Sequence, residues 1–335
     1  MTPRCLLLLS LAASLACAGS GLELVSVKKI WDQAPHCAFG DIISYRGNWY
    51  AVFREGLGHA PRVGQEDDGK LRVLVSKDGE SWESAALVTE PGIDLRDPHL
   101  SITADGRLMI VAGGSQYPQG RYTGRQPRVA FSSDGRTWSA PQKVLEQGHW
   151  LWRVTWYKGR AYGISKYGSP SREMPGDPRR QDLVTSKDGV NWEVVQELKV
   201  PGGDETAVRF LPDGRMVALM RISAGDGLAM IGVSSPPYKE WQWTRTRNFI
   251  GGPNFIVLPN GRMIGGGRYL PGGYGKAQTG LANMTLKSYE PALILPSGGD
   301  SSYPGFAWHQ NMLWTLYYSS HEGRTSIYLA KIKVH

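Results

Sequence analysis

The sequence predicts an all-β fold, a six-bladed β-propeller, and two kinds of repeat carry that prediction. The first is a seven-residue pattern, close to Ser-x-Asp-Gly-x-x-Trp, at 76–82, 132–138 and 186–192, whose aspartates lie 56 and 54 residues apart. The second is a short turn built around glycine or asparagine, at 45–48, 104–107, 157–160, 212–215, 259–262 and, more loosely, 309–312. An Asp-Gly or Asn-Gly turn between apolar runs is typical of a β-hairpin. Hairpins that recur about every fifty residues indicate radially repeated sheets.

Each unit is expected to contain two hairpins, and therefore four strands. The six short turns define six units, and the seven-residue pattern forms the second hairpin in units one to three. Unit four keeps a degraded copy at 234–241, while units five and six have no recognisable copy. The pattern is expected to be an outer hairpin that clamps the blades and lies away from the functional site.

The two ends of the chain have different predicted roles. Residues 1–18 have the pattern of a secretory signal peptide: Arg4, then an apolar run from 6 to 15, then the small residues 16–18. The protein is therefore expected to be secreted or periplasmic, with a lipoprotein anchored through Cys17 as a second possibility. Residues 22–31 form a lone strand that should close the ring by pairing with the last unit. Residues 19–335 are predicted to be one propeller domain.

Charge and composition narrow the classes of partner. The formal net charge is +8, but the basic residues are scattered along the chain, which argues against a nucleic-acid interface. No apolar run after residue 18 is long enough to span a bilayer. The positive charge therefore indicates either a generic basic surface or an electrostatic field that attracts an anionic ligand. The overall charge does not distinguish these two possibilities.

The repeat also serves as a ruler, because equal offsets from the turn should lie at equal places in the blades. Seven residues after the turn glycine, the six units carry Arg54, Gly113, Lys166, Arg221, Arg268 and Tyr318. Nine residues before it, three units carry Asp97, Trp150 and Glu205. Arginines from separate blades that converge on one mouth of the channel would form a cradle for a carboxylate or phosphate. The alternative is that each arginine pairs with a neighbouring acid and only braces the channel.

These residues resemble the sialidase superfamily over essentially the whole mature chain. The seven-residue patterns resemble its Asp boxes, and Arg54, Arg221 and Arg268 resemble its arginine triad. Phe53-Arg54 resembles the start of its first arginine motif, and Asp97-Pro98 its Asp-Pro. Residues 204–206 resemble its glutamate segment, and Ser302-Tyr303 stands where its nucleophilic tyrosine lies.

The resemblance implies an exo-acting retaining glycosidase that removes terminal sialic acid or a related acidic sugar. Tyr303 would be the nucleophile and Glu205 its base, since a neutral tyrosine avoids repulsion from the carboxylate on the anomeric carbon. From its position in the repeat, Trp150 either packs within the blade or stacks on a sugar face, and Lys166 and Tyr318 are further pocket candidates. We expect a monomer that acts on a sialylated or other acidic glycan. The structural alternatives are that Tyr303 only packs within its strand and that Glu205 only forms a salt bridge with Arg221 or Arg268.

The sequence departs from the family at two points. The family's Arg-Ile-Pro is Arg54-Glu55-Gly56 here, and its acid/base aspartate has no clear match. The candidates for that acid are Asp67, with Asp68 beside it, Glu55, His59 and Asp97; Asp67-Asp68-Gly69 also fits a simple turn.

Two other functions stay open from the sequence. The propeller could bind carbohydrate without catalysis, or it could hydrolyse or eliminate another uronate-bearing glycan. No HExxH or Cys-x-x-Cys arrangement occurs, so neither a metal nor another cofactor is predicted.

Overall fold

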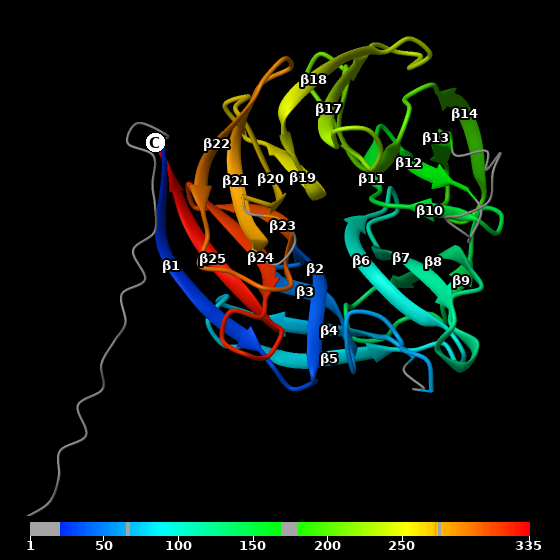
Figure 1. Cartoon of the computed structure of the whole chain (residues 1–335), viewed down its shortest axis with the longest axis vertical. Helices are drawn as coiled ribbons and strands as arrows, with labels where there is room; N and C mark the ends of the chain where they lie inside the picture. Colours follow the sequence, from blue (N-terminus) through cyan, green and yellow to red (C-terminus); the bar gives the residue numbers. More distant parts are fainter. Residues whose placement is uncertain (1–20, 65–67, 169–179, 272, 274–275) are drawn as a thin grey trace, which may run out of the picture.

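The computed structural model describes residues 21–64, 68–168, 180–271, 273 and 276–335. In these residues the chain forms six antiparallel sheets around a central axis (Figure 1), a six-bladed β-propeller as predicted. The predicted signal segment and Asp67 lie outside the described residues. No helix of the described residues is long and apolar enough to cross a membrane.

Blades one to three follow one another along the chain. Blade one consists of β2 (His36–Tyr45), β3 (Asn48–Gly56), β4 (Lys70–Ser76) and β5 (Glu83–Val88). Blade two consists of β6 (Asp94–Ile102), β7 (Leu108–Gln116), β8 (Gly124–Ser132) and β9 (Gln142–Lys143), with a 3-10 turn at Pro118–Gly120. In blade three the innermost strand is split, and the strands are β10 (His149–Leu151), β11 (Thr155–Tyr157), β12 (Arg160–Tyr167), β13 (Arg180–Ser186) and β14 (Trp192–Leu198).

The remaining blades repeat the plan. Blade four consists of β15 (Gly203–Phe210), β16 (Met216–Ile222), β17 (Leu228–Ser234) and β18 (Gln242–Phe249). Blade five consists of β19 (Gly251–Val257), β20 (Met263–Tyr269), β21 (Gln278–Met284) and β22 (Tyr289–Ile294). Blade six consists of β23 (Ser301–His309), β24 (Met312–Ser319), β25 (Ser326–Val334) and β1 (Leu22–Trp31).

The ring closes between the two ends of the chain. β1 pairs antiparallel with β25, with Leu22 opposite Val334, so the N-terminal strand becomes the outer strand of blade six. Figure 1 shows these two strands, blue and red, side by side. The expectation for residues 22–31 is thereby confirmed. This pairing covers one edge of β1 and one edge of β25. It also holds the two ends of the chain together.

Each short turn joins the first and second strands of one blade. The number of short turns in the sequence therefore equals the number of blades. Their central residues have the positive φ that such turns require, for example 75° at Gly47 and 82° at Gly261. The sixth turn uses Gln310 and Asn311, at 48° and 60°. Asparagine tolerates that conformation, so a turn without glycine still forms at the right place.

The seven-residue patterns form three outer hairpins with one hydrogen-bond scheme. In the second copy, Ser132 Oγ donates to Asp134 Oδ1 at 3.0 Å, and the Trp138 indole donates to the Gly135 carbonyl at 3.2 Å. The N–H groups of Thr137 and Arg136 also reach Asp134 and lower its pKa to about 2. The hairpin therefore keeps its shape through local bonds of its own.

Each hairpin glycine packs against the preceding blade. A Cβ added to Gly135 would lie 2.2 Å from the Tyr50 ring, and the Tyr50 hydroxyl donates to the Asp134 carbonyl at 2.9 Å. Gly79 meets Trp314 in the same way, and Gly189 meets Met109. None of the hairpin residues lines the large cavity described below. The hairpins thus clamp neighbouring blades together.

We expect Gly135→Ala to destabilise the propeller by about 2–4 kcal/mol, because the new methyl group both strains a backbone at φ 75° and collides with Tyr50. Gly261→Ala is the matched control: its φ is 82°, but nothing lies within 4 Å of the added Cβ. It should cost only the backbone strain, about 1 kcal/mol. Urea unfolding of both variants measures the difference, and equal losses would show that the contact with Tyr50 contributes nothing.

Candidate active site

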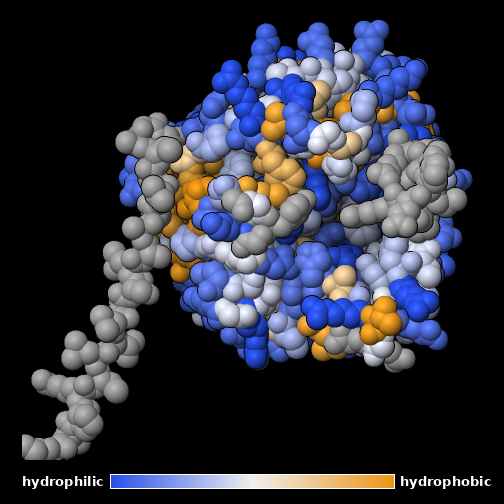
Figure 2. Space-filling model, viewed as in Figure 1, coloured by the Kyte–Doolittle hydropathy of each residue, from blue (hydrophilic) through white to orange (hydrophobic). Residues whose placement is uncertain are grey.

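A cavity of about 970 Å³ opens on one face of the propeller, where the innermost strands begin and the second strands end. Figure 2 shows this face, hollowed near its centre and lined there by hydrophilic residues. The ionisable histidine, arginine, lysine and carboxylic residues of its wall are His59, Arg96, Asp97, Arg125, Lys166, Asp204, Glu205, Arg221, Asp226 and Arg268. Tyr303 and Trp150 also line it. The predicted site residues from several blades therefore share one cavity.

β-Bulges in the innermost strands present the side chains of this cavity. The pairing register shifts at the cavity end of five of these strands, for instance between Arg96 and His99 and between Ser302 and Gly305. Asp97 and Tyr303 lie inside these bulges with positive φ, 50° and 52°. A bulge re-aims a side chain that a regular strand would direct elsewhere. Two of the residues nine positions before the turn, Asp97 and Glu205, thus lie in bulges, whereas Trp150 pairs regularly with Lys166.

Tyr303 and Glu205 form the central pair of the site. The Tyr303 hydroxyl donates to Glu205 Oε1 at 3.1 Å. The other carboxylate oxygen accepts bonds from Arg221 Nη1 and the Gly252 N–H, each at 2.9 Å. Both oxygens of Glu205 are therefore held in place. A Cβ on Gly252 would lie 1.9 Å from the Tyr303 ring, so only glycine leaves room for the tyrosine there.

A buried polar layer lies beneath this pair and fixes the bulges from below. Arg153 donates to Asp41 Oδ2 at 2.9 Å and to the Pro304 carbonyl at 3.2 Å. The Trp152 indole donates to the Pro253 carbonyl at 3.1 Å. These carbonyls directly follow Tyr303 and Gly252 in the chain. The layer thereby supports the backbone that carries the pair.

The protonation of the site follows from its burial. Burial raises the pKa of Tyr303 well above its usual value, and the Glu205 carboxylate raises it further, although Arg268 and Arg221 oppose both effects. The phenol is therefore neutral at neutral pH. Burial also raises the pKa of Asp97 to about 6, against the influence of Arg96 and with a contribution from Glu205. Asp97 Oδ1 has no hydrogen-bond partner among the described residues, which fits a carboxyl group that is easily protonated.

Three arginines of the cavity wall lie near Tyr303: Arg96, Arg221 and Arg268. The Arg268 guanidinium lies 5.1 Å from the centre of the Tyr303 ring. Arg221 donates to Glu205, which also accepts the bond from the Tyr303 hydroxyl. Arg96 escaped the sequence analysis because it neighbours Asp97, and alternation along a regular strand would direct one of the two away from the cavity.

Arg54 is not part of this cavity wall. Its side chain is fully buried, and its Nε donates to Asp94 Oδ1 at 2.6 Å. Its Nη1 also donates to the Gly58 carbonyl at 2.8 Å. The equivalent strand positions were inferred correctly, but the chain after Arg54 folds over the guanidinium. For this arginine the structure has the bracing ion pair that the sequence left open as the alternative.

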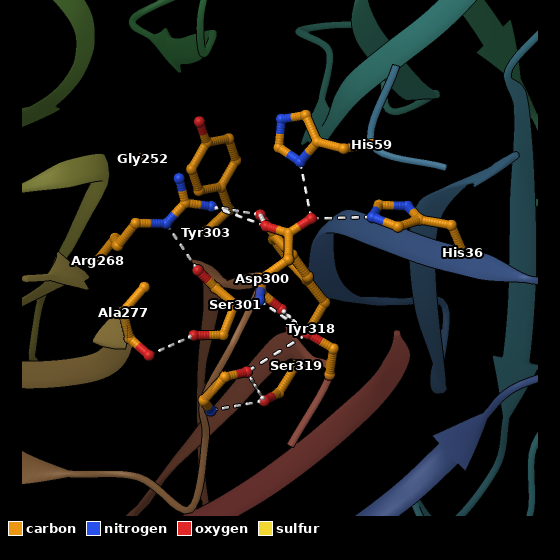
Figure 3. A network of polar contacts seen from close by, with 12 residues as sticks. His36, His59, Gly252, Arg268, Ala277, Asp300, Ser301, Tyr303, Tyr318 and Ser319 are labelled. Carbon is orange, nitrogen blue, oxygen red and sulfur yellow. Dashed lines mark hydrogen bonds and ion pairs between the residues drawn. The ribbon is translucent and has the colours of Figure 1, made fainter. Parts of the chain in front are cut away.

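Asp300 is a functional candidate that the sequence analysis missed. Its Oδ2 contacts His36 Nε2 at 2.9 Å and His59 Nδ1 at 2.7 Å. Its Oδ1 accepts from the Tyr318 hydroxyl at 3.0 Å and lies 3.3 Å from Arg268 Nη2 (Figure 3). Burial alone would raise the pKa of Asp300, but the bonds from His36 and His59 hold it well below its usual range. No repeat signals this residue, since it lies in the loop before β23.

Of the other residues that the sequence predicted for the site, two line the cavity and two lie outside its wall. Trp150 lies in the wall, and its ring fills the space where Gly113 lacks a side chain. Lys166 also lies in the wall and pairs with Asp204. Tyr318 is fully buried behind Arg268. Glu55 does not line the cavity, because it accepts bonds from the Trp31 indole at 2.7 Å and from Arg72.

No protein-family model matches the chain, and neither does any curated protein. Solved structures do match. A Dyadobacter fermentans protein of unknown function has a TM-score of 0.80 at 19% identity, over 94% of this chain and 100% of its own. Trypanosoma rangeli sialidase in complex with the inhibitor DANA has a TM-score of 0.67 at 13% identity, over 95% of this chain and 60% of its own. The fold is a sialidase-like propeller.

A third structural neighbour is a glycosidase of another type. A mutant of an α-L-arabinofuranosidase from Fusarium graminearum, in complex with an iminosugar inhibitor, has a TM-score of 0.68 at 15% identity, over 92% of this chain and 98% of its own. At such identities the likeness concerns the fold alone. This chain spans only 60% of the length of the Trypanosoma sialidase chain.

Proposed function

We propose that the protein is an exo-acting retaining glycoside hydrolase in which Tyr303 is the nucleophile and Glu205 is its base. The observation that carries the proposal is the 3.1 Å hydrogen bond from the Tyr303 hydroxyl to Glu205 inside the cavity. A buried phenol with a raised pKa is a poor nucleophile by itself, and a carboxylate in contact with its proton removes that obstacle. Sialidase and arabinofuranosidase neighbours support glycosidase chemistry on this fold.

The proposed substrate is a terminal sialic acid or a related sugar with a carboxylate on its anomeric carbon. Arg96, Arg221 and Arg268 line the same cavity as Tyr303, and guanidinium binds carboxylate strongly and directionally. A neutral tyrosine can approach an anomeric carbon beside a carboxylate without the repulsion that an anionic nucleophile would meet. The predicted signal segment adds the proposal that the enzyme meets such glycans outside the cytoplasm.

The proposed reaction has two displacements. In the first, the Tyr303 oxygen bonds to the anomeric carbon, its proton passes to Glu205, and the glycosidic oxygen leaves with a proton from Asp97. In the second, water attacks the glycosyl–tyrosine bond and gives one proton to the Asp97 carboxylate. Glu205 returns its proton to the Tyr303 oxygen as that oxygen departs. Two inversions at the anomeric carbon give net retention.

A panel of aryl glycosides tests the proposal: an α-sialoside, an α-L-arabinofuranoside and a glucuronide, each followed by release of the phenol. We expect turnover of the sialoside, with the retained anomer appearing first in the proton NMR spectrum. Tight sialoside binding in calorimetry without turnover would overturn catalysis and select the carbohydrate-binding module. Turnover of the glucuronide alone, by hydrolysis or by elimination to an unsaturated sugar, would replace the substrate class.

A further inference from the structure

We infer that His36, His59 and Asp300 form a binding site for a divalent metal ion of the zinc class at the edge of the cavity. Among the described residues, they are the one group whose histidine, cysteine and carboxylate donor atoms converge in this way, all within 4.8 Å of one another. His36 comes from the start of β2, His59 from the loop after β3 and Asp300 from the loop before β23. An ion there would join the first and last blades.

The separations suit ligands of one small ion. Both imidazole nitrogens already lie near a single oxygen, Asp300 Oδ2, at 2.9 Å for His36 and 2.7 Å for His59 (Figure 3). Two atoms that bind the same zinc ion tetrahedrally at about 2.0–2.2 Å are separated by about 3.4 Å. All the donor atoms lie within 4.8 Å of one another, so small side-chain movements would bring them to that separation. Two imidazoles and one carboxylate are a donor set that zinc accepts.

The ligand rings are held by packing. Phe39 contacts the His59 ring edge-on, with ring centres 5.0 Å apart, and the His36 ring at 6.0 Å. Arg96 donates to the His59 carbonyl at 3.0 Å and so fixes the loop. The Tyr318 hydroxyl holds the second oxygen of Asp300 at 3.0 Å. Such supporting contacts orient the ligands of a metal site.

The charges around Asp300 bear on the affinity for a cation. A metal ion would take the place of the proton between His36 Nε2 and Asp300 Oδ2, which lie 2.9 Å apart. Arg268, 3.3 Å from Asp300, acts against a second cation, and for that reason we expect micromolar rather than nanomolar affinity.

The site is an open one. The His59 side chain is 50% exposed and lines the cavity, whereas His36 and Asp300 do not line it. A coordination position without a protein ligand would therefore lie on the His59 side. Zinc sites with three protein ligands keep a position for water or a ligand oxygen. Hydroxyl or carboxylate oxygens of a sugar in the cavity are within the class of ligand that such an ion accepts. This role goes beyond the displacement chemistry proposed above, which uses no ion.

Titration of the chelator-treated full chain with ZnCl₂ by calorimetry, and with CoCl₂ by visible absorption, tests the inference. We expect one equivalent to bind, and His59→Ala or Asp300→Asn to weaken binding at least about tenfold. His335→Ala is the matched control, because His335 is also about half exposed and contacts a carboxylate, Glu23, at 2.8 Å but has no second imidazole nearby. It should bind like the unaltered protein.

Two outcomes would overturn the inference: no saturable binding of either ion, or equal weakening by His59→Ala and His335→Ala. Thermal melting without metal checks that the His59→Ala variant is folded, which its half-exposed side chain favours. No glycoside enters these measurements. An inactive protein that binds zinc would leave the metal site standing, and an active protein that binds none would leave the proposed function standing.

Discussion

Tyr303→Phe is expected to lower kcat/KM for an aryl α-sialoside by about 10³-fold or more, the largest effect of any single substitution in the cavity. The change removes only the hydroxyl that donates to Glu205. The ring keeps its edge-on contact with Trp152, whose centre lies 5.3 Å away, and its place against Gly252. The cavity should therefore keep its shape, and calorimetry should still detect binding of a sialoside.

Tyr317→Phe is the matched control for that experiment. Tyr317 is also fully buried in blade six and donates its hydroxyl to the Pro296 carbonyl at 2.8 Å, but it does not line the cavity. Its loss should cost about 1 kcal/mol of stability through one hydrogen bond and leave kcat/KM unchanged. Undiminished turnover by Tyr303→Phe, with a normal Tyr317→Phe control, would remove Tyr303 as the nucleophile.

The repeat allowed the fold to be predicted because turn chemistry is local. Gly47 and its equivalents have φ values that few other residues adopt, so the sequence marks the corner between the first two strands of nearly every blade. The closing strand at 22–31 was also predictable, since a lone strand beside a ring of complete blades has one unsatisfied neighbour. Sequence periodicity thus carries most of the architecture.

The cavity was only partly predictable, because equal offsets fix backbone positions and not the partners of side chains. Arg221 and Arg54 occupy equivalent positions, yet the first lies in the cavity wall and the second is buried against Asp94. Arg96 reaches the cavity through an irregular register that no composition rule signals. Asp300 has no counterpart in other blades. These contacts depend on loops that the repeat does not describe.

The assignment of Asp97 as the proton donor makes a prediction about pH. The donor must be protonated when the substrate binds, and burial raises the pKa of Asp97 to about 6. Since the protonated fraction falls tenfold per pH unit above that value, kcat/KM should fall with the same slope as pH rises through and beyond about 6. Asp97→Asn cannot donate in this way, so the variant should lose this limb of the profile.

Asp97→Asn should also separate substrates by their leaving groups. General acid catalysis contributes about 10²- to 10⁴-fold, and a nitrophenol needs little of it because its oxygen leaves readily as an anion. The loss should therefore be large for a sialyl-sugar and small for the nitrophenyl sialoside. Asparagine tolerates positive φ better than most residues, so the backbone at 50° should persist.

Asp182→Asn is the control that distinguishes this role from a general effect of a buried carboxyl group. Burial raises the pKa of Asp182 as well, but Asp182 pairs with Arg180 in blade three and does not line the cavity. Its substitution should leave the profile unchanged. If Asp97→Asn keeps a limb near pH 6, the donor is another group, and His59 is then the protonatable residue of the cavity wall to test by the same two measurements.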